Sequence, residues 1–319
     1  MQFLQLNDEL QYFKAKYEVT KELEQIVTQL GYTLFEPDFF ESYDQFVQMN
    51  QRVKTQSLVK LLDQDGSILV LRPDITTSVI KRVIPKWVES NTLRLFYLST
   101  IFSRSSVGSV EEKKQFGIEH LGTNQRIADV ETIQLIISLF KRFNLSFLIE
   151  LSNNQFLNAL MKELQLSFTS QKELKEILYY KNQAALEMFI KQTTIPSPFI
   201  ELVSQLLHLQ GSLVEIKQIL SRYPLTSPMQ NAMDELEVLM NSFSIEEQNQ
   251  SIRIDLTVLS QYDYYDGLIF KAYVPTIPVP ILSGGRYDPL TKMVGLEIPA
   301  IGFTLNMSDF IKEVIQTNE

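Results

Sequence analysis

The chain of 319 residues contains no cysteine and only two histidines, His120 and His208. The lack of cysteine excludes disulfides, thiolate nucleophiles and cysteine-ligated zinc, and is typical of a reducing compartment. The two histidines lie too far apart in the sequence to suggest metal ligation, so we expect no metal and no cofactor. We interpret His208 as a partly buried helix histidine. We interpret His120 as a structural histidine on a strand, with a pH-sensing role or a place at the rim of a site as the alternative.

Long apolar runs and an excess of basic residues are missing as well. No apolar run approaches the ~20 residues that span a bilayer, and the first residues lack the basic start and apolar core of a signal peptide. We therefore expect a soluble, cytoplasmic protein. The 29 basic residues are outnumbered by 38 acidic ones, giving a net charge of −9, which argues against a nucleic-acid-binding surface. Neither of the common glycine-rich phosphate-binding motifs occurs.

Two strand-rich regions enclose a helical one. Strand patterns occur through residues 1–152, vanish between 153 and 251, and resume at 252. This order predicts an α+β fold, in which residues 1–152 and 252–319 form an antiparallel sheet flanked by helices. Residues 153–251 are predicted to form a helical insertion subdomain.

Hydrophobic periodicity and turn residues place the individual elements. The predicted helices are 8–30, the segment that follows Asp74, 127–143, 154–164, 173–180, 199–209 and 229–243. The predicted strands are 32–36, 59–62, 68–71, 93–102, 116–121, 146–151, 252–256, 268–273 and 280–282. Strands 59–62 and 68–71 are predicted to pair as a hairpin. Residues 111–114 are interpreted as a charged loop, and Gly284-Gly285 as a turn.

Polar side chains recur at the ends of several of these strands. Asp74 and Thr76 stand where strand 68–71 passes into a helix, and Gln115 and Glu119 face the same side if they share a strand. A ligand ammonium group needs hydrogen-bond acceptors, and the carboxylate of Asp74, the hydroxyl of Thr76 and the amide of Gln115 could supply them. A second carboxylate with a phenol, such as Glu119 with Tyr265, suits the two ring nitrogens of an imidazole.

Each of these residues also has a structural explanation. Asp74 can be a helix N-cap, and Gln115 with Glu119 can form the solvent face of an edge strand. Tyr264 and Tyr265 can pack on the core as aromatic residues at a strand end. Only their combination favours a ligand site.

The order of these segments resembles the class II histidyl-tRNA synthetases, whose motifs match at six points along the chain. The matching segments are Leu-Arg-Pro-Asp-Ile-Thr at 71–76, Gln-Phe-Gly-Ile-Glu at 115–119, Ala-Asp-Val-Glu at 128–131, Tyr-Asp-Tyr-Tyr at 262–265, Gly-Gly-Arg-Tyr-Asp at 284–288 and Ala-Ile-Gly-Phe at 300–303. The resemblance implies a class II synthetase-like fold from about residue 6 to 315.

The same resemblance implies roles for single residues. Asp74, Thr76 and Gln115 would hold the amino group of histidine, and Glu119 with Tyr265, beside Tyr264, would contact its ring. The implied supports of this pocket are Arg72, Gly284, Gly285 and Arg286.

Three positions depart from the synthetase pattern. By the resemblance, arginines that grip the phosphates or stack on adenine belong near Ser103, Ser260 and Asp309, and none of these residues is cationic. Adenylate formation needs cations on the phosphates, and the loss of one such group typically costs ~10²–10³ in rate. We therefore expect no catalytic residue and no amino-acid activation.

A synthetase-like core with these losses resembles the regulatory subunit of ATP phosphoribosyltransferase. A histidyl-tRNA synthetase continues past the matching motif into an anticodon-binding domain, and only a short segment follows residue 310 here, so we expect no such domain and no tRNA partner. The resemblance implies a partnership with the short-form catalytic subunit in the first step of histidine biosynthesis. It also implies histidine as the feedback effector. Pairing through residues 8–36 would give a homodimer within a hetero-oligomer, of which a hetero-octamer is one form.

Two other functions fit the sequence less well. One is a truncated histidyl-tRNA synthetase-like enzyme, or another adenylate-forming ligase, that activates histidine with ATP. The other is a module that senses tRNA or histidine, against which the net charge of −9 argues. If histidine is the effector, its site is either the synthetase-like pocket or the interface between the two kinds of subunit.

Overall fold

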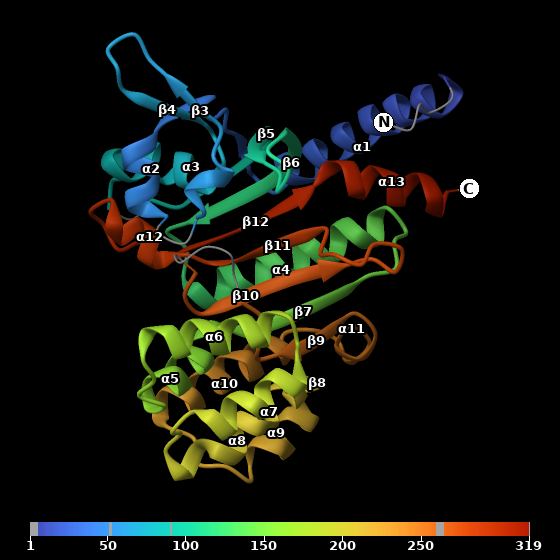
Figure 1. Cartoon of the computed structure of the whole chain (residues 1–319). Coiled ribbons are helices and arrows are strands. Elements are labelled where there is room, and N and C mark those ends of the chain that lie inside the picture. The colour runs from blue at the N-terminus through green and yellow to red at the C-terminus, as the bar shows by residue number, and fades with distance from the viewer. Residues whose placement is uncertain (1–5, 51–52, 90, 260–264, 319) are drawn as a thin grey trace. The chain divides into compact units, whose positions relative to one another are not determined.

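The computed structural model describes residues 6–50, 53–89, 91–259 and 265–318, which divide into two compact units. The first unit holds the described residues up to Phe147 and from Tyr273 onward, and the second holds those from Leu148 to 259 together with Tyr265–Ala272. Figure 1 traces the chain through both. No helix among the described residues is long and apolar enough to cross a membrane.

The first unit combines one main sheet, one small sheet and several helices. Its helices are α1 (Leu6–Gln29), α2 (Tyr43–Met49), α3 (Thr76–Val83), α4 (Gln125–Arg142), α12 (Asp288–Met293) and α13 (Met307–Thr317), with short 3-10 turns at Thr55–Ser57 and Ile84–Lys86. Its strands are β1 (Thr33–Leu34), β2 (Phe40–Ser42), β3 (Lys60–Leu62), β4 (Ile68–Leu71), β5 (Leu93–Arg104), β6 (Val110–Leu121), β11 (Leu282–Arg286) and β12 (Ala300–Asn306).

The main sheet of this unit runs in the order β1-β5-β6-β12-β11. All its neighbours are antiparallel except β1, which pairs with β5 in parallel. The register places Glu119 opposite Gly302, and Gly302 opposite Gly285, so these residues share one face. His120, Ile301 and Arg286 form the next row and therefore point to the other face.

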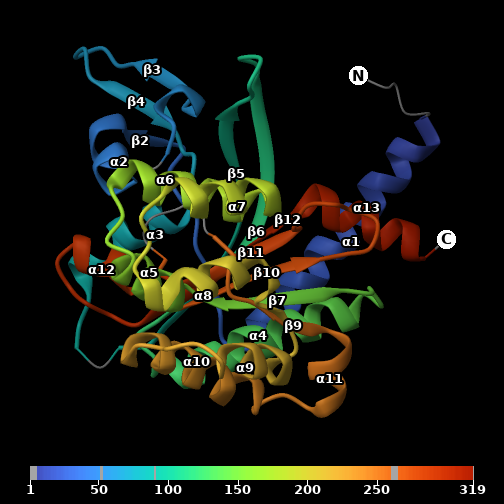
Figure 2. The same ribbon diagram turned by 60° about the horizontal axis from the view of Figure 1, so that its bottom comes forward.

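The small sheet has the order β2-β4-β3. Its hairpin turns at Gly66, whose φ of +85° favours glycine. Figure 2 shows this hairpin, and the far end of the long β5–β6 hairpin, extending from the first unit. The β4 strand leads directly into α3, so the small sheet positions the residues at the start of that helix.

The second unit joins a helical array to a sheet with the order β10-β7-β9-β8, in which β7 and β9 are parallel. Its strands are β7 (Leu148–Asn153), β8 (Gln210–Gly211), β9 (Ile252–Asp255) and β10 (Leu268–Tyr273). Its helices are α5 (Asn154–Glu163), α6 (Phe168–Tyr179), α7 (Gln183–Gln192), α8 (Ile200–Gln205), α9 (Leu213–Leu220), α10 (Ser227–Met240) and α11 (Ile245–Gln250), with 3-10 turns at Ser197–Phe199 and Leu206–His208.

Most predicted elements are confirmed, with a few corrections. Residues 111–114, predicted as a loop, lie within β6 and pair with β5, because the hairpin turns earlier, at residues 105–109. Gly284 and Gly285 are not a turn but two paired residues of β11. His208 is exposed rather than partly buried. Helices α2, α7, α9 and α11 were not predicted, since their apolar faces are short.

Candidate functional site

The centre of the candidate site is the carboxyl group of Glu119, on the face of β6 toward the start of α3. Its side chain is almost fully buried, with the residue only 1% exposed. Thr76 Oγ1 donates a hydrogen bond to Glu119 Oε1 at 2.7 Å, and the Tyr287 hydroxyl donates to Oε2. Three segments distant in sequence therefore meet at one carboxyl group.

The carboxyl group of Glu119 is buried without a cationic partner among the described residues. Burial raises the pKa of Glu119 to about 8, and the nearby charge of Asp74 raises it too, while the hydroxyls of Tyr287 and Thr76 lower it. No cation is paired with it among the described residues. A ligand that brings a cationic or N–H group to Glu119 would offset the cost of ionising it in this buried position.

Asp74 lies beside Glu119 and bonds the first turn of α3. Its Oδ2 accepts hydrogen bonds from the backbone N–H of Thr77 at 2.8 Å and from Thr77 Oγ1 at 2.6 Å. Burial is the main reason why the pKa of Asp74 is raised, and the charge of Glu41 adds to it. Asp74 thus bonds the first turn of α3 as expected, but from the residue before the N-cap, which is Ile75. The site holds two buried carboxyl groups.

Two glycines make room for the side chains on this face. A methyl group on Gly302 would lie 2.1 Å from Glu119 Oε2 and 2.4 Å from the Ile118 carbonyl oxygen. A methyl group on Gly117 would lie 2.3 Å from the Tyr97 hydroxyl. Glu119 and Tyr97 therefore lie flat over glycine backbone, an arrangement that any side chain at these positions would block.

Gln115 shares the face and strand of Glu119, as predicted. It is half-buried and lies between Ser99 of β5 and Asn306 of β12 in the sheet register. The four-residue separation along a strand places its Cα about 13 Å from that of Glu119. A ligand contacting both would lie along β6, across Gly117.

Arg72 supports the site from outside it. Its Nε donates to the Thr100 carbonyl oxygen at 2.6 Å, and its Nη1 donates to that of Pro37 at 2.7 Å. The guanidinium group also lies over the Phe39 ring, 4.4 Å from its centroid. Arg72 therefore joins β5 and the segment before β2 to the turn that carries Asp74.

Arg286, also predicted to support the pocket, points away from Glu119. Its Nη1 donates to Asp129 of α4 at 2.5 Å, and its Nη2 lies 3.4 Å from Asp288. His120 lies on the same face, with its Nε2 2.8 Å from Thr123 Oγ1. Burial, Arg94 and Arg286 together lower the pKa of His120 to about 4, so the ring is neutral at pH 7.

The two predicted tyrosines are not both described. Tyr264 and Ser260 lie outside the described residues. Tyr265 belongs to the second unit, where its carbonyl oxygen accepts a hydrogen bond from Asn154 Nδ2 at 2.9 Å. Its predicted contact with a ligand ring stays a prediction.

The positions expected to have lost phosphate-binding arginines carry no cation. Ser103 lies in β5 opposite Glu111. The neighbouring Arg104 is exposed, and its Nη1 donates to the Gly108 carbonyl oxygen within the hairpin turn at 3.0 Å. Asp309 lies in the first turn of α13, where its carboxylate accepts from Asn306 Nδ2 at 2.6 Å. Asp309 thus binds the side chain of Asn306, the N-cap residue of α13.

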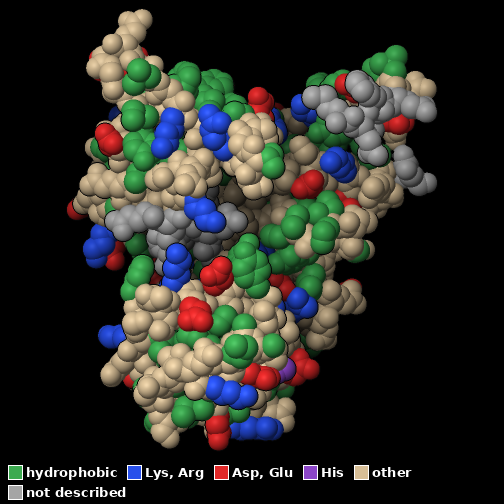
Figure 3. All heavy atoms as spheres, in the orientation of Figure 1, with side chains coloured by type: hydrophobic (Ala, Val, Ile, Leu, Met, Phe, Trp, Pro, Cys, Tyr) green, Lys and Arg blue, Asp and Glu red, His purple; other side chains and the backbone are tan. Residues whose placement is uncertain are grey.

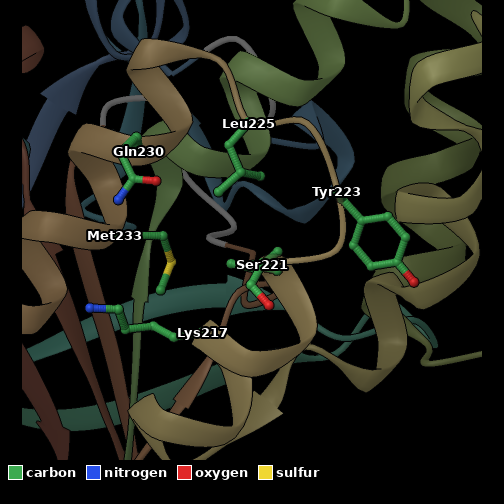
Figure 4. A pocket seen from close by; sticks show the side chains of 7 residues that line it. Lys217, Ser221, Tyr223, Leu225, Gln230 and Met233 are labelled. Carbon is green, nitrogen blue, oxygen red and sulfur yellow. The ribbon is translucent and has the colours of Figure 1, made fainter.

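Other parts of the described chain offer weaker candidates. No group of three or more possible ligands among the described residues could hold a metal ion. A cavity of about 370 Å³ lies between α9 and α10 of the second unit, with Leu225 and Met233 among its lining residues (Figure 4). Two of its polar lining residues are already engaged, because Lys217 pairs with Glu237 and Gln230 donates to Asp234. On the face seen in Figure 3, basic and acidic side chains are interspersed.

The family model described as histidyl-tRNA synthetase matches residues 9–310. An ATP phosphoribosyltransferase regulatory subunit from Clostridium botulinum is 34% identical over 307 residues, covering 93% of this chain and 71% of the relative. The chain belongs to the family of ATP phosphoribosyltransferase regulatory subunits, relatives of histidyl-tRNA synthetase. A second member, from Thermoanaerobacter sp., is 31% identical over 92% of this chain and 77% of its own length.

Solved structures agree on the fold of this family member. A Bacillus halodurans structure titled as an ATP phosphoribosyltransferase regulatory subunit/histidyl-tRNA synthetase has a TM-score of 0.84 and 27% identity, covering 95% of this chain and 79% of that one. A chain from a Thermotoga maritima ATP phosphoribosyl transferase complex shows the fold alone, with a TM-score of 0.69 and 18% identity over 92% of this chain and 97% of that one. The predicted α+β, class II synthetase-like fold is confirmed. The sheet was predicted to be antiparallel, but the strand pairs β1–β5 and β7–β9 are parallel.

Sequence reasoning missed two residues that shape the site. Tyr287 was seen only as part of a matching segment, and Tyr97 not at all. The signal for Tyr287 is its place directly after Arg286, the last residue of β11, because side chains of consecutive residues in extended backbone point to opposite sides. Tyr97 lies within the apolar run 95–98 of β5, which gives no indication that its ring lies over Gly117.

Proposed function

We propose that this chain is the regulatory subunit of an ATP phosphoribosyltransferase, and that it senses histidine at the Glu119 site. The curated relatives carry that regulatory name over more than nine-tenths of this chain. In the proposal, the chain does no chemistry of its own. It binds the short-form catalytic subunit, supports its activity, and transmits histidine occupancy as inhibition of the first step of histidine biosynthesis.

The observation that carries the proposal is the buried Glu119 carboxyl group held by two hydroxyl donors. Thr76 and Tyr287 fix its orientation, and no protein cation among the described residues is paired with it. An imidazole N–H is a matching donor for such a carboxyl group. Asp74 and Gln115, in the same unit as Glu119, can hold the ammonium group.

The absence of catalysis is inferred from the residues at the phosphate-binding positions. Ser103 is uncharged, and Asp309 would repel a polyphosphate. A serine also stands at position 260. A cationic clamp is worth ~10²–10³ in rate for each group, so activation of histidine with ATP is not expected from this chain.

We further propose that a second copy of the chain covers the N-terminal half of α1. Leu6, Leu10, Phe13 and Tyr17 are 70%, 48%, 53% and 65% exposed. Their 4-3-4 spacing forms one apolar stripe, the pattern of a helix that packs against another helix. Strand β1 lies at the edge of the sheet, and its Leu34 is 50% exposed. A symmetric pair would bury both features, as closed homodimers do.

The proposal is tested by reconstitution with a short-form ATP phosphoribosyltransferase. We expect the two chains to co-purify, the activity to rise on mixing, and histidine to inhibit the mixture. Glu119→Gln keeps the shape of the side chain but removes its charge, and should weaken histidine inhibition at least about tenfold. Lys292→Gln, which breaks an exposed pair with Glu297, is the matched control.

Three outcomes would count against the proposal. Lack of activation on mixing would remove the regulatory role. Histidine inhibition that is unchanged in Glu119→Gln would move the sensor to the interface between subunits. Pyrophosphate exchange by the pure chain with histidine and ATP would show an active synthetase-like enzyme instead.

A further inference from the structure

Two strands connect the Glu119 site to the opposite face of the sheet in the first unit. On β6, Glu119 faces the site while its neighbour His120 faces α4. At the end of β11, Tyr287 donates to Glu119 while its neighbour Arg286 faces α4. Consecutive strand residues point to opposite faces, so a backbone shift that follows a change at Glu119 or Tyr287 also moves His120 or Arg286.

Helix α4 receives both of these side chains through charged groups. Asp129 Oδ1 lies 2.5 Å from Arg286 Nη1, and both side chains are largely buried. Glu131 Oε2 lies 2.6 Å from Arg94 Nη2 and 3.8 Å from His120 Nδ1. The helix is therefore tied to the row of residues directly behind the site.

The same helix reaches α1, the helix that carries the exposed apolar stripe. Arg142, at the C-terminal end of α4, donates from Nε to Glu22 of α1 at 2.6 Å. Arg94, which pairs with Glu131, also donates to the Leu30 carbonyl oxygen just after α1 at 3.2 Å. A continuous chain of contacts thus runs from the site through α4 to α1.

The layer between α4 and the sheet is not fully hydrogen-bonded. His120 Nδ1, Thr132 Oγ1 and Arg286 Nε are buried and have no hydrogen-bond partner among the described residues. Buried polar atoms usually have partners, and each one left without costs about 1–3 kcal/mol. These atoms can accept or donate hydrogen bonds that the present position of α4 does not supply, so the layer can support more than one position of the helix.

We propose that α4 is a two-position element that transmits occupancy of the Glu119 site to α1. A ligand bound to Glu119 and Tyr287 favours one position of α4, through Arg286–Asp129 and the Arg94–Glu131–His120 group. The inference rests on the proposed function, because it takes histidine as the ligand. Beyond that function, it assigns α4 as the path from the Glu119 site to α1, and Asp129 and Glu131 as positioning residues that do not touch the ligand.

Amide hydrogen exchange of the full chain tests the route directly. We expect saturating histidine to change exchange rates in α4 by at least about threefold. Helix α10 of the second unit should not respond. If histidine binds and α4 exchanges as before, the inference is overturned while the proposed function stands. If histidine does not bind the chain, or binds Glu119→Gln as tightly as the wild type, the proposed sensor itself has failed.

The variant Asp129→Asn separates binding from transmission. It removes the charge that pairs with Arg286, and its histidine dissociation constant should stay within about threefold of wild type. With the catalytic subunit, the activity remaining at saturating histidine should rise at least about fivefold, the lower end of common allosteric coupling. Lys292→Gln should change neither quantity. If Asp129→Asn fails to fold, Glu131→Gln replaces it, since that side chain is 42% exposed.

Two results with these variants would overturn the inference. In one, both Asp129→Asn and Glu131→Gln bind histidine normally and are inhibited normally. In the other, binding and inhibition fall together, which would mean that the ion pairs only hold the pocket in shape.

Discussion

Tyr287 donates its phenolic hydrogen to Glu119, from a position 168 residues later in the chain. The contact forms because β12 lies between β6 and β11 and is antiparallel to both. It brings the Gly-Gly-Arg-Tyr-Asp segment onto the same carboxyl group as Thr76. A ligand that bonds to Glu119 must therefore compete with, or add to, two hydroxyl donors already in place.

The first prediction concerns stability between pH 6.5 and 8. The folded pKa of Glu119, about 8, lies above its ordinary value of 4.5, so the folded state holds a proton that the unfolded state has released. Stability from this group is present below pH 4.5 and is lost as pH rises through 8. We expect the free energy of unfolding to fall by at most about 1.4 kcal/mol per pH unit relative to Glu119→Gln.

Urea unfolding of both proteins at several pH values measures this difference. Equal pH dependence of the wild type and Glu119→Gln between pH 6.5 and 8 would show that Glu119 is already ionised in the folded chain. Added histidine should reduce the difference, because the bound ligand stabilises the charged carboxylate.

The second prediction concerns the loss of stability below pH 6.5 that results from the buried His120. The pKa of His120 is lowered from 6.5 to about 4, so below pH 6.5 the unfolded state takes up a proton that the folded state does not. Stability from this group is present above pH 6.5 and is lost as pH falls toward 4. Relative to His120→Gln, the wild type should lose about 1 kcal/mol per pH unit in that range. Thermal melting from pH 7 to 4.5 tests it, and parallel curves would contradict it.

The third prediction concerns the glycine beneath Glu119. Gly302→Ala places a methyl group 2.4 Å from the Ile118 carbonyl oxygen and 2.1 Å from Glu119 Oε2. Either the strands separate or Glu119 leaves its position, so we expect a loss of about 1–3 kcal/mol in stability and weaker histidine binding. Gly295→Ala has open space around its Cβ but a φ of +116°, so it serves as a control for backbone strain without a clash. Normal histidine affinity in Gly302→Ala would contradict the proposed position of the ligand.

The fourth prediction concerns self-association through α1. Phe13→Glu would place a charge within the apolar stripe, and we expect it to raise the dimer dissociation constant at least about tenfold. Gln11→Glu adds the same charge away from the stripe, since residues two apart on a helix do not share a face. Sedimentation velocity over a range of concentrations distinguishes them. A dimer equally stable in both variants would place the interface elsewhere.

Local sequence patterns predicted a large part of this architecture. The spacing of apolar residues in 8–30 and 127–143 is a property of neighbouring positions, and the helices α1 and α4 follow it closely. The Asp63-Gln64-Asp65-Gly66 turn predicted the β3–β4 hairpin for the same reason. The prediction failed where it relied on charge: residues 111–114 are charged but belong to β6, whose pairing with β5 outweighs their polarity.

The sequence by itself determined the order of the motifs, the apolar periods of the main elements, and the absence of cations at 103, 260 and 309. The tertiary structure alone decided which side chains meet. It showed that Thr76 and Tyr287 donate hydrogen bonds to Glu119. It also showed that Arg286 points to the other face of the sheet, where it binds Asp129. The reason is physical: the face a strand residue occupies depends on register with strands far away in the chain, and a shift of one residue would reverse it.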